Sequence, residues 1–457
     1  NTADNNLGIG LNALGNNTTG TPNLAIGSLA LSSNVTGTDN LAIGLNALTL
    51  NTVSNNLAIG SGALDANTTG TPNLAIGLNA LGLNTIGNSN VAIGFNALAS
   101  NTGGSDNTAI GRQAMNNNSN GQFNTCIGNS SLFNATNASN TIAIGYNALV
   151  NNTASNNTAI GARVMDANTT GTQNVAIGVD ALGGNISGSN NIAIGYNALL
   201  VNNILGNVGI GPRALVANTT GTPNLAIGFD ALAANVTGVD NLGIGFNALL
   251  VNTGSENLAI GARSMDANTS GQFNLAIGTD ALGASVTVND NLAIGYNTLA
   301  VNTVANNLAI GSRALDVNTT GTPNLAIGSD ALGANITGND NLAIGFDCLI
   351  LSTVSDNLAI GPRALDANTI GTPNLAIGVD ALGGNTNATN NLAIGFNALL
   401  VNNGGNNLAI GARALDANTS GTGNLAIGAD ALGSNTNNSD SIAIGISALA
   451  LSTGTGN

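Results

Sequence analysis

The sequence of 457 residues contains no lysine, histidine or tryptophan, and only seven arginines and two cysteines. Without histidine, the Ser-His and Cys-His pairs that activate a nucleophile cannot form. The lack of lysine and a net charge of −15 argue against binding to nucleic acid, which requires clustered positive charge. Asn or Gly interrupts every apolar run before it reaches the roughly 18 residues of a membrane span, so we predict a chain that is not membrane-embedded.

What the chain does contain is one short repeat. An Ile-Gly pair, usually preceded by Ala, recurs 27 times at intervals of 16 or 17 residues, from Gly10 to Gly445. A fixed short period is the sequence signature of a solenoid. Units that are three apart along the chain resemble each other most. Residues 1–457 are therefore predicted to form a single continuous β-solenoid of 27 repeats, grouped in nine super-repeats of about 50 residues, with no separate domain.

The repeated segment NLAIG alternates as a strand does, with Leu and Ile on one side and Asn, Ala and Gly on the other. We expect a short strand, a corner at the Gly, a second short extended stretch around the following Ala-Leu, and a polar turn. Stacked units of this kind predict an all-β fold, a parallel β-solenoid or β-roll. Its 27 rungs, spaced about 4.8 Å apart, would form a rod about 130 Å long.

Two columns of the repeat are predicted to form the core. The Ile before the Gly is invariant, and the fourth place after the Gly is always Leu or Met. Because Met is a near-isosteric substitute for Leu in a packed interior, these methionines indicate packing and not a ligand site. The predicted core residues include Ile26, Ile43, Met115, Met165 and Met265.

Asparagine precedes the strand in nearly every unit and recurs at the seventh place after the Gly. Stacked Asn amides can hydrogen-bond from rung to rung, as in cross-β ladders. Alternatively, Asn stands there because it tolerates the backbone angles of turns. Both interpretations are compatible with the pattern.

The few charges decide how many residues make one rung. Arg stands at the second place after the Gly in one unit type and Asp at that place in the next. A rung of about 50 residues would stack Arg on Arg, at a cost of roughly 1 kcal/mol per pair even in water. A rung of 16 or 17 residues instead places each Arg beside an Asp. We therefore predict one repeat per rung and an inter-rung charge ladder of Arg163, Asp180, Arg213, Asp230, Arg263, Asp280, Arg313, Asp330, Arg363, Asp380, Arg413 and Asp430.

Aromatic residues are rare, but in one unit type, which returns at every third unit, the residue directly after the Gly is often aromatic. Such a row can be a self-association seam against another copy of the chain. It can also consist of side chains that fold over a slightly shorter rung. The candidate seam comprises Phe95, Tyr146, Tyr196, Phe246, Tyr296, Phe346 and Phe396.

The segments NLAIGFNALL and NTAIGRQAM resemble the head repeats of YadA-like trimeric autotransporter adhesins. They are also similar to the NTAIGYxAL repeats of tail-fibre-like and adhesin-like proteins of bacteria and phages. The likeness covers the whole chain. It implies a left-handed parallel β-roll, a trimer, and adhesion at a cell surface.

No catalytic or metal-binding pattern emerges from the sequence. Cys126 and Cys348 each stand in place of a small Ala, and 13 rungs of about 4.8 Å between them exclude a disulfide. Neither the GxxxxGK[ST] loop nor the Gly-Gly-x-Gly-x-Asp calcium pattern occurs. We predict no catalytic residues, no metal, no cofactor and no enzymatic activity.

These observations predict a structural, extracellular protein of the cell surface that associates with itself into a filament or adhesin shaft. Association can be lateral, or end to end with the rung of Ile444 against that of Ile9, since neither end has a polar cap. One alternative is an adhesin that binds cell-surface glycans or proteins through its repetitive polar face with avidity. A minor alternative is ice binding by the Thr row at the eighth place after the Gly.

Overall fold

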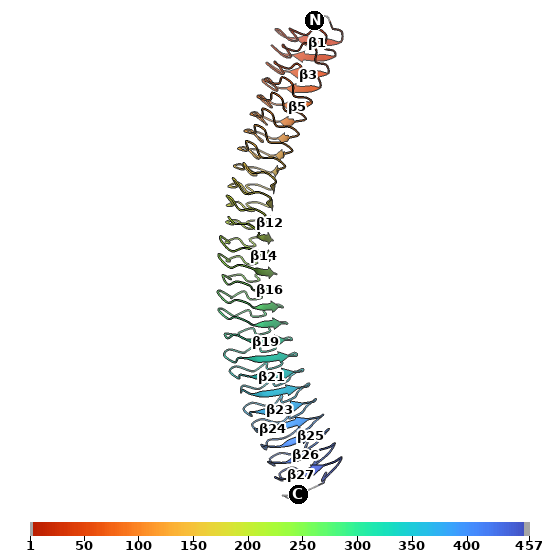
Figure 1. Cartoon of the computed structure of the whole chain (residues 1–457), viewed down its shortest axis with the longest axis vertical. Helices are drawn as coiled ribbons and strands as arrows, with labels where there is room; N and C mark the ends of the chain where they lie inside the picture. The colour runs from red at the N-terminus through yellow and green to blue at the C-terminus, as the bar shows by residue number, and fades with distance from the viewer. Residues whose placement is uncertain (1–2, 452–457) are drawn as a thin grey trace. The chain divides into compact units, whose positions relative to one another are not determined.

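The computed structural model describes residues 3–451, which contain 27 short β-strands and no helix. The chain divides into two compact units, Asn1–Ile227 and Gly228–Asn457. In each unit the strands are stacked one above the next and point the same way (Figure 1). The first unit contains β1 (Asn6–Ile9), β2 (Asn23–Ile26), β3 (Asn40–Ile43), β4 (Asn56–Ile59), β5 (Asn73–Ile76), β6 (Val91–Ile93), β7 (Thr108–Ile110), β8 (Thr125–Ile127), β9 (Ile142–Ile144), β10 (Thr158–Ile160), β11 (Val175–Ile177), β12 (Ile192–Ile194), β13 (Val208–Ile210) and β14 (Asn224–Ile227). The second contains β15 (Asn241–Ile244), β16 (Leu258–Ile260), β17 (Leu275–Ile277), β18 (Leu292–Ile294), β19 (Asn307–Ile310), β20 (Asn324–Ile327), β21 (Asn341–Ile344), β22 (Asn357–Ile360), β23 (Asn374–Ile377), β24 (Asn391–Ile394), β25 (Leu408–Ile410), β26 (Leu425–Ile427) and β27 (Ile442–Ile444).

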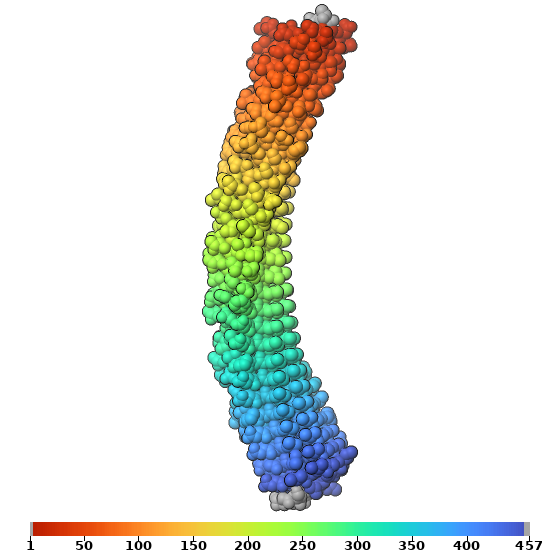
Figure 2. Space-filling model, in the orientation of Figure 1, coloured from red at the N-terminus to blue at the C-terminus, as the bar shows by residue number. Residues whose placement is uncertain are grey.

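Within each unit, every strand but the last pairs in parallel with the strand of the next repeat, and equivalent residues are partners. Ile26 of β2 pairs with Ile43 of β3, and Leu392 of β24 pairs with Leu408 of β25. The predicted all-β parallel solenoid with one 16- or 17-residue repeat per rung is therefore confirmed. The side chains of successive rungs form rows along the stack, visible in the green-to-blue residues of Figure 2. That the solenoid is continuous over residues 1–457 stays a prediction.

The invariant Gly ends each strand in a conformation that a side chain cannot share. Gly60 has a φ of 137°, and a Cβ placed on it would lie 2.4 Å from the backbone oxygen of Gly77 on the next rung. Both the backbone angle and the close approach of the next rung require glycine here. This explains why the Gly recurs in all 27 units.

The segment after the Gly is a turn, so the predicted second extended stretch is wrong. Asn46 and Leu48, two and four residues after Gly44, both have the left-handed φ of 57° and 51°. The Leu48 amide donates to the backbone oxygen of Ala63 on the next rung at 3.0 Å. Two left-handed residues with a single residue between them reverse the direction of the chain, so that it runs back towards the strand. This reversal brings the Leu side chain inside.

The core is filled by the Ala of the strand and the Leu or Met of the turn. Ala42 and Leu48 are fully buried, and the predicted core methionines Met115, Met165 and Met265 are at most 1% exposed. The interior is narrow: a Cβ on Gly209, which replaces the strand Ala, would lie 3.1 Å from Leu199 Cγ. Only small residues can therefore occupy the inward positions of the strand.

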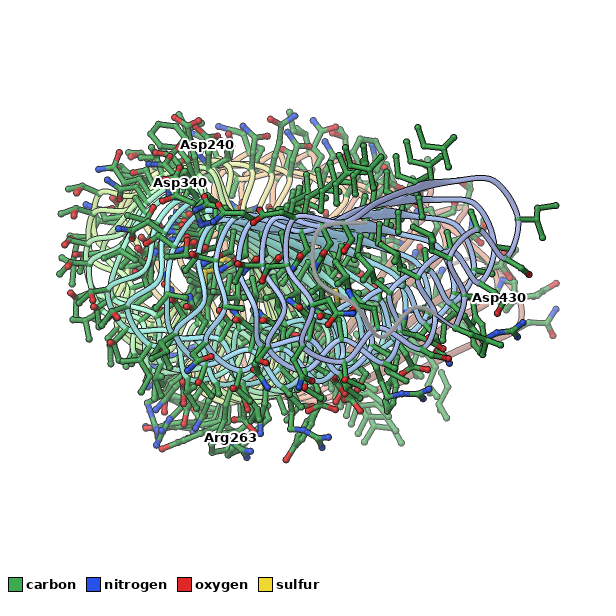
Figure 3. The ribbon with its side chains drawn as sticks, turned by 90° about the horizontal axis from the view of Figure 1, so that it is seen from below. Asp240, Arg263, Asp340 and Asp430 are labelled. Carbon is green, nitrogen blue, oxygen red and sulfur yellow. The ribbon has the colours of Figure 1, made fainter. Side chains whose placement is uncertain are left out.

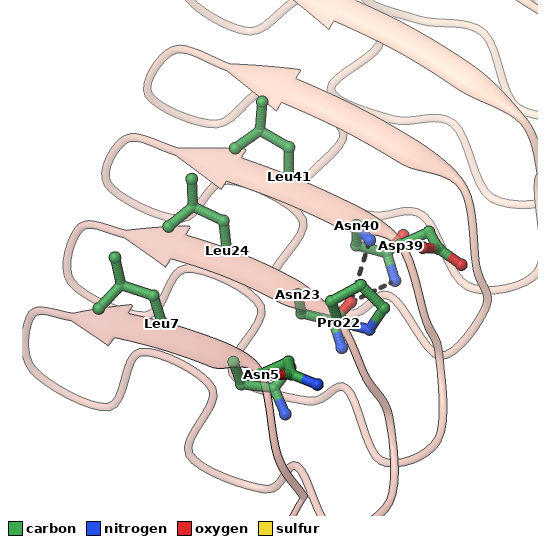
Figure 4. A pocket seen from close by; sticks show the side chains of 9 residues that line it. Asn5, Leu7, Pro22, Asn23, Leu24, Asp39, Asn40 and Leu41 are labelled. Carbon is green, nitrogen blue, oxygen red and sulfur yellow. Dashed lines mark hydrogen bonds between the residues drawn. The ribbon is translucent and has the colours of Figure 1, made fainter.

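The prediction that Ile26 and Ile43 belong to the core is wrong. Leu24 and Ile26 do share one face of the strand, but that face points outward and both side chains are half-buried. Because Ala and Asn occupy the inward positions, the pleat of the strand directs the larger residues to solvent. In Figure 4 the side chains of Leu7, Leu24 and Leu41 form a row on this outer face.

Two buried Asn ladders hold adjacent rungs together. At the strand start, the backbone N–H of Asn40 donates to Asn23 Oδ1 at 3.0 Å, and the side-chain Nδ2 of Asn40 donates to the backbone oxygen of Val53 at 2.9 Å. In the turn, Asn34 Nδ2 donates to Asn17 Oδ1 on the neighbouring rung at 2.9 Å. Stacking from rung to rung, one of the two predicted interpretations, is thus present in both columns.

Candidate functional site

The charge ladder forms with bidentate geometry. Arg163 Nε lies 2.7 Å from Asp180 Oδ1, and its Nη2 lies 2.6 Å from Oδ2. A planar guanidinium bound through two parallel hydrogen bonds fixes orientation as well as distance. Arg213 belongs to the first unit and Asp230 to the second. The other predicted pairs, each within one unit, join Arg163 to Asp180, Arg263 to Asp280, Arg313 to Asp330, Arg363 to Asp380 and Arg413 to Asp430.

A second carboxylate accompanies each of these five pairs, which the sequence analysis did not single out. Burial, followed by the nearby charge of Asp180, raises the pKa of Asp166 above its ordinary value. In contrast, the hydrogen bond from Arg313 lowers the pKa of Asp330. The pKa is raised, mainly by burial, at the equivalent residues Asp166, Asp266, Asp316, Asp366 and Asp416.

The aromatic row is exposed. Its seven members, from Phe95 at 42% to Tyr196 at 55%, do not fold into the core. For six of them the neighbour on the next rung is the Arg of the ladder, as shown by the Arg313 amide donating to the backbone oxygen of Tyr296 at 2.9 Å, whereas Phe95 accepts from the Gln113 amide. Phe246 also stacks on Phe229, the equivalent residue one rung earlier, with ring centroids 5.8 Å apart. The exposed members are Phe95, Tyr146, Tyr196, Phe246, Tyr296, Phe346 and Phe396.

The outer face of the strands is an apolar surface that recurs from rung to rung, and sequence reasoning missed it by assigning the Ile to the core. It consists of two rows, which we call the outer rows: the Ile before each Gly, and the Leu, Val, Ile or Thr two residues earlier. Stacking on neighbouring rungs leaves them half-buried within a stack, with Ile127 at 38% and Ile192 at 38% exposed. The sequence did contain a signal for this arrangement. The residue between the two outer rows is always Ala, Gly or Cys, and this restriction to small residues marks the side of the strand that points inward.

A further row lies beside the outer rows, at the residue that precedes the strand Asn. We call it the turn row. Apart from the prolines, its residues, such as Asp39 with a φ of 58°, adopt the left-handed conformation that favours Asn and Asp. Figure 4 shows Pro22 and Asp39 of this row across from the Leu side chains, with a shallow groove between. The same groove recurs beside Phe273 and Asp290, and beside Asp356 and Pro373.

The cysteines and the threonine hydroxyls are engaged within the fold. Burial raises the pKa of the Cys126 thiol far above its usual range and that of Cys348 to about 12, so neither is a ready nucleophile. Within residues 3–451, no three His, Cys, Asp or Glu side chains come together as a metal site, and no helix is able to cross a membrane. Thr52 Oγ1 donates to the backbone oxygen of Thr68 on the next rung at 2.9 Å. Its single hydroxyl proton is therefore used within the protein.

Comparison with protein-family models, with curated proteins and with solved structures gives no match. The likeness to adhesin heads accordingly depends on the repeat motifs alone. The structure itself defines a parallel β-solenoid with a charge ladder, an aromatic row, two outer rows and a turn row.

Proposed function

We propose that this chain is a non-enzymatic structural protein whose solenoid associates laterally with further copies of itself, as part of a fibre or shaft at the cell surface. The observation that carries the proposal is the composition of the outer rows, in which no rung has a charged residue. Extended apolar surface on a soluble protein marks an interaction site. Here it recurs on every rung of both units.

The geometry suits association between identical copies. Because each rung repeats the last in register, a contact made between two rungs can be made again by the next pair. Burial of apolar surface contributes about 25 cal/mol per Å², so a weak contact becomes strong when many rungs take part. The aromatic row borders the outer rows at the residue after the Gly and can extend this contact.

A second function, adhesion to cell-surface glycans or proteins, is favoured by the aromatic row and its neighbours. Tyr296 is 52% exposed and lies beside Arg313, whose bidentate partner Asp330 stands on the next rung. Exposed aromatic rings beside planar charged groups offer both an apolar face and hydrogen-bonding groups. Repetition along the stack would add avidity. Ice binding gains no such support, because the Thr hydroxyls bond to the next rung.

The test of lateral association compares two variants that add the same charge. Ile294→Glu places a carboxylate in an outer row, whereas Ser270→Glu places one in an exposed turn. Sedimentation velocity of the full chain over a range of concentrations is expected to show assemblies for the unaltered chain and for Ser270→Glu. Ile294→Glu is expected to sediment as smaller species, with an unchanged circular dichroism spectrum. A monomeric unaltered chain at high micromolar concentration would refute the proposal.

A further inference from the structure

The turn row of the second unit is rich in exposed carboxylates that have no cationic partner in their own row. Six residues of this row carry a carboxylate, and none is Arg. The ladder arginines lie elsewhere, as Figure 3 shows with Asp240 and Asp340 on one side and Arg263 on the other. Among residues 3–451 the ion pairs within a unit all belong to the ladder. The exposed carboxylates are Asp240, Glu256, Asp290, Asp340, Asp356 and Asp440.

An exposed aromatic ring stands within this acidic row. Phe273 is 50% exposed and occupies the rung between those of Glu256 and Asp290. The stacking is fixed by the backbone: the Phe273 amide donates to the oxygen of Ser255 at 3.4 Å, and the Asp290 amide donates to that of Gln272 at 3.2 Å. Phe273 thus has a carboxylate on either side.

Phe273 and Glu256 are not residues that this backbone position favours. Both have a φ of 58°, a left-handed conformation in which Asn, Asp or Gly is far easier to accommodate than a bulky side chain. Most other rungs place Asn, Asp or Gly there, or have Pro with a negative φ. A Phe flanked by carboxylates therefore has no explanation in the local backbone.

The third component is the groove between the turn row and the outer rows. A cavity of 460 Å³ is lined by Phe273 and Asp290 on one side and by Leu275 and Leu292 on the other. It therefore combines an acidic rim, an aromatic face and an aliphatic wall. An aromatic face attracts cations electrostatically, and carboxylates strengthen the attraction.

We propose that the groove around Phe273 binds an extended, arginine- and lysine-rich peptide segment of a partner protein. One cationic side chain lies over the Phe273 ring between Glu256 and Asp290. Alternate apolar side chains of the peptide pack against Leu275 and Leu292. Asp240 and Asp356 lie seven rungs apart, about 34 Å, which matches about ten residues of extended peptide.

The partner cannot be a second copy of this chain bound through its ladder. The chain has no lysine, and five of its seven arginines are held in bidentate pairs whose release would break the ladder. Charge complementarity with a chain of net charge −15 points instead to a basic partner. This binding goes beyond lateral association. It uses the turn row together with the row of Leu275 and Leu292 beside it, whereas lateral association uses both outer rows and no residue of the turn row.

The test measures fluorescence anisotropy of a labelled ten-residue peptide of alternating Arg and Val, titrated with the full chain. Glu256→Gln/Asp290→Asn is expected to weaken binding about tenfold, and Phe273→Ala to weaken it several-fold. The matched control, Asp266→Asn/Asp416→Asn, removes two carboxylates beside the ladder and is expected to change affinity by less than about twofold.

Three outcomes would overturn the proposal: no binding of the peptide, equal weakening by the control variant, or equal binding of a peptide alternating Glu and Val. Equal weakening would mean that only the overall negative charge attracts the peptide. Sedimentation separates this proposal from lateral association. Glu256→Gln/Asp290→Asn is expected to assemble normally, whereas Ile294→Glu is expected to bind the peptide while failing to assemble.

Discussion

Arg363 and Asp380 are 17 residues apart in sequence, yet Arg363 Nε lies 2.6 Å from Asp380 Oδ1 on the adjacent rung. The same spacing and geometry recur in both units. About half of the Arg363 side chain remains exposed, so solvent weakens the attraction. The ladder therefore contributes most to register, because a slip by one rung would move every Arg away from its Asp.

The ladder predicts that reversing the charge of one partner of an Arg–Asp pair destabilises the stack, whereas reversing both partners does not. Asp380→Arg places two guanidinium groups on adjacent rungs and is expected to increase hydrogen exchange in β22 and β23. The double variant Arg363→Asp/Asp380→Arg restores an opposite-charge pair and is expected to return exchange to near that of the unaltered chain. Equal exchange in both variants would contradict a pairwise role.

The Asn ladders predict a local weak point where both are interrupted. Ala135 stands in the turn ladder between Asn118 and Asn152, and Thr141 stands at the start of the next strand in place of Asn. Restoring the ladders with Ala135→Asn/Thr141→Asn is expected to raise the free energy of unfolding of the first unit by about 1 kcal/mol. Thermal unfolding of the full chain measures it.

The reverse change serves as the control for this prediction. Asn152→Ala opens a second gap and leaves Asn168 Nδ2 without its 2.6 Å partner on the neighbouring rung. It is expected to destabilise by about 1–3 kcal/mol, because a buried polar group loses its hydrogen bond. A neutral result for both variants would show that the ladders add little to stability.

The glycine corner predicts a large effect from one methyl group. Gly60→Ala combines a φ of 137° with a Cβ 2.4 Å from the oxygen of Gly77, and is expected to destabilise by at least about 3 kcal/mol. Gly206→Ala is the control, because Gly206 has a φ of 76° but a Cβ there would meet only Thr222 Oγ1, at an ordinary contact distance of 3.5 Å. It is expected to cost about 1 kcal/mol, which separates strain from the clash. Equal thermal stability of the two variants would contradict this.

The carboxylates in and beside the charge ladder predict how the stability of the chain changes with pH. Burial raises the folded-state pKa of Asp166 and its four equivalents, so protonation favours the folded chain as pH falls through those values. Asp330 and Asp430 have lowered pKa values, and their contribution is present at neutral pH and lost only below the ordinary Asp range. Melting temperature is thus expected to rise as the pH falls from 7 towards the ordinary Asp range.

Replacing the five raised carboxylates with Asn removes the groups responsible for this rise. In the variant Asp166→Asn/Asp266→Asn/Asp316→Asn/Asp366→Asn/Asp416→Asn, this rise in melting temperature on acidification is expected to be lost. The variant is also expected to melt at a higher temperature than the unaltered chain at pH 7, since the like-charge contacts with Asp180 and its equivalents are gone. A rise that persists in this variant would assign the pH dependence to other groups.

The rung was predictable because it depends on spacing, which the sequence displays directly. Arg163 and Asp180 had to be neighbours if one repeat made one turn, and the Met at position 115 marked a packed column. The direction of the strand pleat was not predictable from hydrophobicity, because Ile26 is larger and more apolar than Ala25 and yet faces outward. The width of the interior decides which face of the strand points inward. The left-handed turn at residues such as Asn46 and Leu48 makes the interior narrow, so only small residues fit on the strand that faces this turn.

Lateral association brings the outer rows of two copies of the chain together, and a single introduced thiol detects this contact. Both native cysteines are buried, so Ile294→Cys and Ser270→Cys each carry one accessible thiol. Under mild oxidation at equal concentration, Ile294→Cys is expected to form disulfide-linked dimers much faster than Ser270→Cys. Equal rates, or faster linkage through residue 270, would contradict lateral association through the outer rows.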